Sequence, residues 1–179
     1  MAFARPYALA DGLAGALARI LAWAGGLVLI ALVAMTCLSV LGRALVPLGG
    51  APLAGDFEMV ELGIGFAVFS FLPWTQYAGA HARVSLFERA FGPRLSGLLD
   101  LAAEMLMAGA AVLLTWRLWL GMVDKRSYGE TSMILQWPVW HAYAAGFAAS
   151  VAWSFVALFC AVRAARALAS HAAPASRLA

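Results

Sequence analysis

Residues 20–42 read ILAWAGGLVLIALVAMTCLSVLG and contain no charged side chain. A helix needs about 20 apolar residues to cross the roughly 30 Å hydrocarbon core of a bilayer, so this stretch is long enough to span a membrane. Three further apolar stretches follow along the chain, at 62–80, 101–122 and 131–162. The stretch at 101–122 is the weaker candidate, because it carries Glu104 and Arg117. The pattern predicts an all-α integral membrane protein with four transmembrane helices.

The composition agrees with this assignment. Of the whole chain, 64% is hydrophobic and 12% is charged, and the mean hydropathy is +0.87. These values lie well outside the usage of soluble domains. The polar connectors are too short to fold as a separate soluble module, so a soluble domain would have to belong to a partner.

We expect the membrane domain to cover residues 17–164. Its spans are predicted at about 17–46, 57–78, 94–122 and 138–164. Residues 1–16 and 165–179 are expected to form an N-terminal segment and a tail on the same side of the membrane. That side, with the connector between the second and third spans, carries eight of the 12 Lys and Arg residues. Because basic residues favour the cytoplasmic side, we predict a bacterial inner-membrane protein with both termini in the cytoplasm.

The connector between the second and third spans has the pattern of a short amphipathic helix. At about 100° per residue, Val84, Phe87 and Phe91 share one face, whereas Arg83 and Arg89 lie away from it. This pattern is typical of a helix that lies in the membrane interface. We therefore expect an interfacial helix at about 84–91, with Arg83 as an anchoring residue.

Two glutamates lie at the start of the second span, Glu58 and Glu61, across a short turn from Arg43. Residues three apart on a helix are neighbours, so the two carboxylates could bind a proton or a cation. They could instead form a charge cluster that pairs with Arg43 or with a partner subunit. The first span offers no third ligand or matching acid, and this favours the charge cluster.

The third span carries Asp100 and Glu104, one helical turn apart. A helix that starts near Pro93 places Glu104 about 16 Å along its axis, where a carboxylate is costly unless it is paired or faces protein. We expect a long, tilted helix whose first turns lie at the lipid headgroups. At the start of the fourth span, Trp137 and Trp140 are expected to mark the membrane interface.

The three histidines do not form a cofactor site. His81 lies in the cytoplasmic connector and His141 at the opposite end of the fourth span, while His171 is in the tail. A haem held by two facing histidines is therefore not expected, and no Cys/His cluster for zinc or iron–sulfur is present. The sequence also lacks a phosphate-binding Gly-rich loop and a nucleophile elbow. We expect a protein that is not an enzyme and binds no cofactor.

Four short motifs occur in a defined order along the spans. They are SVLGR at 39–43, FEMVE at 57–61, GAHARV at 79–84 and QWPVW at 136–140. Together they resemble the small membrane subunit of TRAP (tripartite ATP-independent periplasmic) transporters, and the resemblance covers nearly the whole chain. The family often has Asn where Ser39 stands, and usually has Asp where Ser85 stands.

The resemblance implies a division of labour. A periplasmic solute-binding protein would deliver an organic acid, and a large permease subunit would hold the substrate and sodium sites. The small subunit would brace the large one among the membrane lipids and help to dock the binding protein, without a substrate, metal or nucleic-acid site of its own. The candidate anchoring or partner-interface residues are Arg43, Glu58, Glu61, His81, Arg83, Asp100, Glu104, Trp137 and Trp140.

Two alternatives to this function stay open. The first is a membrane anchor or assembly subunit of another multi-protein complex, and a large permease encoded beside this chain would argue against it. The second is a proton-coupled exporter built from two four-span copies. Such an exporter needs an acid near the middle of a span that lines the pathway, whereas the second span has acids only at its edge.

Overall fold

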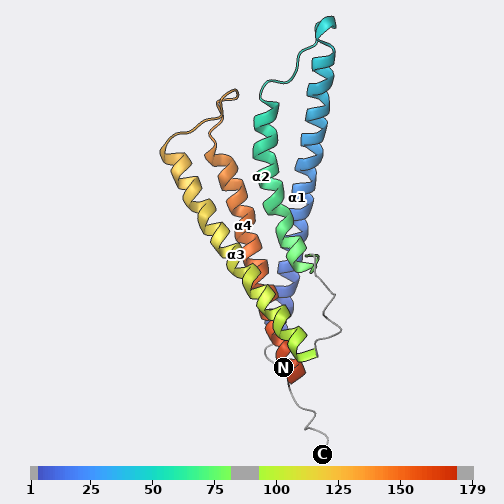
Figure 1. Cartoon of the computed structure of the whole chain (residues 1–179), viewed down its shortest axis with the longest axis vertical. Coiled ribbons are helices and arrows are strands. Elements are labelled where there is room, and N and C mark those ends of the chain that lie inside the picture. The colour runs from blue at the N-terminus through green and yellow to red at the C-terminus, as the bar shows by residue number, and fades with distance from the viewer. Residues whose placement is uncertain (1–3, 82–92, 173–179) are drawn as a thin grey trace, which may run out of the picture.

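The computed structural model describes residues 4–81 and 93–172. In this part of the chain it contains four long helices, α1 (Ala4–Ala44), α2 (Asp56–Tyr77), α3 (Pro93–Ser127) and α4 (Trp140–Ala172), and a short 3-10 helix, η1 (Val46–Leu48) (Figure 1). All four long helices have the length and apolar character needed to cross a membrane. The prediction of an all-α fold with four such helices is confirmed. The interfacial helix predicted at 84–91, together with Arg83, lies outside the described residues.

Helix α1 is longer than the span expected at 17–46, because it begins at Ala4 and has 41 residues. At about 1.5 Å per residue it is about 60 Å long, roughly twice the thickness of the hydrocarbon core. A tilt of about 60° would be needed to immerse all of it, and membrane helices tilt by about 40° at most. One or both ends of α1 therefore extend beyond the hydrocarbon.

The helices pack in the order α3, α4, α2, α1, with a smaller contact between α1 and α4. They form two pairs, α1–α2 and α3–α4, which converge at the end where α1 begins and α4 finishes (Figure 1). The pairs diverge toward the opposite end. We call these the converging end and the diverging end. Helix α4 is the central helix. Half of the residues in its most apolar 18-residue stretch are buried, against 11% in the corresponding stretches of α1 and α3.

The core follows α4 on two of its faces. One cluster joins α4 to α1 and contains Ala14, Ala18, Val156, Phe159 and Cys160. The other joins α4 to α3 and contains Ala108, Ala111, Trp153, Ala157 and Ala161. Residues four apart lie on one face of a helix. Positions 153, 157 and 161 of α4 therefore share the face toward α3, whereas positions 156 and 160 share the face toward α1. The alanines let the backbones approach closely, and such contacts stabilise helix pairs in membranes.

Candidate functional site

At the diverging end, a polar contact closes the turn between α1 and α2. The Ser39 hydroxyl, 2% exposed, donates a hydrogen bond of 2.6 Å to Asp56 Oδ2. Arg43 lies one turn further along α1, and its Nη2 atom is 4.0 Å from the same oxygen. The partner of Arg43 in this chain is therefore Asp56 rather than Glu58 or Glu61. A role of these two glutamates in binding a partner subunit stays a prediction.

Glu58 binds the connector between α3 and α4. One of its carboxylate oxygens accepts the backbone N–H of Ile134 at 2.7 Å, and the other accepts that of Leu135 at 3.0 Å. The Leu135 side chain lies against Gly55, which precedes α2 and has a φ of 77°. Only glycine adopts this conformation without strain, and a Cβ there would collide with Leu135. This corner therefore requires both Glu58 and Gly55.

The connector itself is a closed hairpin at 130–139, which we call the 130–139 hairpin. The N–H of Val139 donates to the Glu130 carbonyl at 3.0 Å, and the N–H of Ser132 donates to the Trp137 carbonyl at 2.9 Å. Residues 131 and 138 form an antiparallel bridge. The backbone of the hairpin is thus fixed by its own hydrogen bonds as well as by Glu58.

Gln136 has a φ of 52°, and it is the only non-glycine residue with a positive φ among the described residues. This left-handed conformation costs about 1–2 kcal/mol for a residue with a side chain. The Gln136 amide offsets the cost, because it donates to the Met133 carbonyl at 3.0 Å and accepts from the Thr131 hydroxyl at 3.1 Å. The hairpin tip is therefore held in one defined shape.

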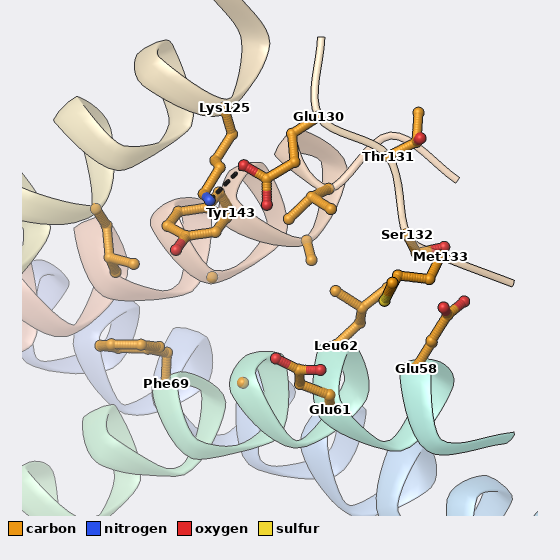
Figure 2. A pocket seen from close by; sticks show the side chains of 15 residues that line it. Glu58, Glu61, Leu62, Phe69, Lys125, Glu130, Thr131, Ser132, Met133 and Tyr143 are labelled. Atoms are coloured by element: carbon orange, nitrogen blue, oxygen red, sulfur yellow. Dashed lines mark hydrogen bonds and ion pairs between the residues drawn. The ribbon is translucent and has the colours of Figure 1, made fainter. Parts of the chain in front are cut away.

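A cavity of about 490 Å³ opens between α2 and the α3–α4 pair, below the hairpin (Figure 2). Its rim is polar, with Glu58 and Glu61 on α2 and an ion pair between Lys125 and Glu130 on the opposite wall. Figure 2 shows Glu61 pointing into the opening. No hydrogen bond or ion pair joins the Glu61 side chain to another residue of the described part of the chain.

The deeper walls of this cavity are apolar and include Leu62, Phe69 and Leu118. A second cavity of about 490 Å³ lies between α1, α2 and α4 and shares Leu62 with the first. It is lined mainly by apolar side chains, including those of Met35 and Phe66. Both cavities lie at the diverging end, where the helix pairs separate (Figure 1).

The two tryptophans selected from the sequence flank His141 at the start of α4. Trp137 Nε1 donates to His141 Nδ1 at 3.1 Å, and the rings of Trp140 and His141 lie 3.9 Å apart between centroids. The Arg126 guanidinium lies over Trp140 at 5.3 Å. This aromatic cluster joins Trp137 of the 130–139 hairpin to the first turn of α4, and its position at the membrane interface stays a prediction.

At the converging end, Gln76 of α2 is 1% exposed and joins three elements. Its Nε2 atom donates to Glu104 Oε2 of α3 at 2.6 Å, and its Oε1 atom lies 3.0 Å from His81 Nε2. Its backbone carbonyl accepts the Cys160 thiol of α4 at 3.7 Å. Glu104 thus faces protein, which lowers the cost of a carboxylate at that depth. Asp100, one turn earlier on α3, is exposed.

Tyr77 extends this network to the remaining helix. Its hydroxyl donates to Asp11 Oδ1 of α1 at 3.2 Å, and its carbonyl accepts Arg163 Nη2 of α4 at 3.2 Å. We call Asp11, Gln76, Tyr77, His81, Glu104 and Arg163 the converging-end network. Gln76 and Tyr77 were not predicted from the sequence as site residues, although two polar residues at the end of an apolar span are a visible signal.

The described residues therefore define a multi-pass membrane protein whose four long helices are tied together by the chain's own polar side chains. No group of three or more His, Cys, Asp or Glu side chains that could hold a metal ion occurs among residues 4–81 and 93–172.

Comparison with known proteins gives the family. Residues 32–170 match the family model described as the DctQ component of tripartite ATP-independent periplasmic transporters. The chain belongs to this family, the small and non-catalytic permease component of TRAP transporters. No curated protein and no solved structure gives a significant match. The resemblance found in the sequence and the expectation of a non-enzyme are confirmed.

Proposed function

We propose that this chain braces the large permease subunit of a sodium-coupled, binding-protein-dependent importer of an organic acid. In this function it also helps to dock the periplasmic solute-binding protein. Membership in the DctQ family supports a complex with both partners. The importer type and the docking role go beyond family membership and are part of the proposal.

The observation that carries the proposal is the converging-end network. It connects α1 through Asp11, α3 through Glu104 and α4 through Arg163, all to two adjacent residues of α2. Hydrogen bonds to charged groups contribute more than neutral ones, and this network lies toward the end where the helix pairs converge (Figure 1). A brace must resist shear between its helices while its partner moves, and a junction of this kind provides that resistance.

Outward faces of α1 and α3 supply the surface for a membrane partner. On α1, five large apolar residues spaced three, four or seven apart are between 65% and 73% exposed: Leu13, Ile20, Trp23, Leu27 and Ile30. On α3, a second stripe is between 45% and 76% exposed: Leu95, Leu99, Leu106, Leu113 and Trp116. Such spacing places each set on one face, which suits packing against lipid or against helices of the large subunit.

The orientation of the chain is also part of the proposal. Three arginines at the converging end lie over aromatic rings: Arg19 over Trp74, Arg163 over Tyr77 and Arg166 over Tyr7. In the whole sequence, the side that holds both termini and the connector between α2 and α3 carries eight of the 12 Lys and Arg residues, and this supports a cytoplasmic location for the converging end. The diverging end, with the 130–139 hairpin, then lies on the periplasmic side.

Purification of the tagged chain from its native membrane in mild detergent tests the proposal. We expect the large permease to co-purify in stoichiometric amount, and the reconstituted complex to take up organic acid only with a sodium gradient and the binding protein. Recovery of a different complex, or of a homodimer alone, would contradict the brace and favour an anchor or a small exporter.

A further inference from the structure

The tip of the 130–139 hairpin exposes large apolar side chains. Met133 is 90% exposed and Ile134 is 61% exposed, while Tyr128 and Trp137 at the base are 82% and 49% exposed. Neither Met133 nor Ile134 has a charged neighbour within the tip sequence Ser132–Gln136. Apolar side chains grouped at the end of a connector indicate a contact surface.

The shape of the tip is fixed by contacts that reach it from another helix. The Glu58 carboxylate of α2 binds the two backbone amides at 134 and 135, and Gln136 holds a left-handed conformation while its side chain bonds to Thr131 and Met133 across the turn. Strained conformations persist only where surrounding contacts over-determine them, and they gather at functional sites. Adsorption to lipid depends on apolar area and does not need a defined backbone shape, so a fixed tip favours recognition by a folded protein.

We propose that Met133 and Ile134 form a contact for the periplasmic solute-binding protein, with Glu58 as the positioning residue of the hairpin. This inference rests on the proposed function, because it specifies where on this chain the docking takes place. Glu58 acts through the hairpin backbone and does not itself touch the partner.

The size of the tip distinguishes this partner from the large permease subunit. Two side chains of this kind cover roughly 300 Å² at most, below the about 800 Å² per partner of a stable interface. A permanent subunit contact has the long stripes of α1 and α3 available. A small, preformed tip suits an encounter that forms and dissociates in each transport cycle.

Site-specific photocrosslinking tests the contact in the intact transporter. The complex of this chain with the large permease is reconstituted in liposomes with benzoylphenylalanine at position 133, and the separately purified solute-binding protein of the same transporter is added. The matched control places the crosslinker at Leu48, which is 84% exposed in η1 at the same end of the molecule. We expect an adduct with the binding protein from position 133 and little from position 48.

Adducts with the large subunit or lipid alone from position 133 would overturn the inference, as would equal adducts from both positions. These results would leave the proposed function standing, because the complex has formed. If the large permease does not associate with the chain at all, the proposed function fails and this inference fails with it.

Affinity measurements give a second test. Replacement of both tip residues, Met133→Ser with Ile134→Ser, is expected to raise the Kd of the binding protein for the reconstituted complex about tenfold. Glu58→Ala should act in the same direction, whereas Asp124→Asn, on an exposed side chain near the end of α3, should not. An unchanged Kd in the tip variant with intact complex yield would refute the docking role of the hairpin.

Discussion

The converging-end network predicts that Gln76 contributes strongly to the stability of the helix packing. We consider the variant Gln76→Leu, which keeps a similar side-chain volume and removes both polar atoms. Two bonds are lost, the 2.6 Å bond to the Glu104 carboxylate and the 3.0 Å contact with His81. Because position 76 is buried, with Gln76 only 1% exposed, water cannot take the place of the Gln76 amide as a hydrogen-bond partner of Glu104 or His81.

The magnitude follows from the type of bond. A hydrogen bond to a charged group contributes about 1.5–3 kcal/mol and a neutral one about 1 kcal/mol, while bonds measured within a membrane protein average about 0.6 kcal/mol. We therefore expect Gln76→Leu to lower the free energy of unfolding by about 2–3 kcal/mol. The variant Glu104→Gln keeps the shape but loses the charge, and about half of the loss is expected for it.

The assay is reversible unfolding of the purified chain in mixed micelles with increasing SDS, followed by circular dichroism. The control is Thr36→Val, which removes a hydroxyl that bonds only to the Leu32 carbonyl of its own helix. We expect the control to change stability by less than about 0.5 kcal/mol. If Gln76→Leu unfolds at the same SDS fraction as the control, the network does not hold the helices together, and this result would contradict the proposed brace.

Three further predictions concern other parts of the molecule. Tyr77→Phe keeps the ring beneath Arg163 and removes the bond to α1, so the same SDS titration should show a loss of about 0.5–1 kcal/mol; no loss would mean that this bond is not formed. Gly55→Ala should destabilise the chain by about 1–3 kcal/mol and increase hydrogen exchange in the 130–139 hairpin, and unchanged exchange would contradict the link between Gly55 and the hairpin. Finally, Leu27→Lys and Leu106→Lys each place a charge within an outward stripe. A lysine at the centre of a membrane-spanning helix raises the free energy of insertion by about 2.5–3.5 kcal/mol. The variant whose stripe faces the large permease should reduce the yield of co-purified permease. Yields unchanged from that of the wild-type chain in both variants would exclude these faces as the subunit contact.

Several features of the fold could be predicted from the sequence because they depend on local composition. The lengths of the apolar stretches indicate four spans, since the bilayer thickness sets the length that each helix needs. The Pro and Gly residues at 47–55 predict the break between α1 and α2. The order of the short motifs predicts the family, which the match of residues 32–170 confirms.

The partners of the charged residues could not be predicted in the same way. A helix that is apolar around its whole circumference gives no signal of which face is buried. The rotation of α2 and α3 about their axes therefore could not be predicted, and neither could the bond between Gln76 and Glu104. Arg43 contacts Asp56, the first residue of α2, instead of Glu58 or Glu61, which lie further along that helix. The sequence by itself determined how many times the chain can cross a membrane. Only the tertiary structure decided the rotation of each helix about its axis, and with it the converging-end network and the bond between Glu58 and the hairpin, since these contacts join residues up to 86 positions apart.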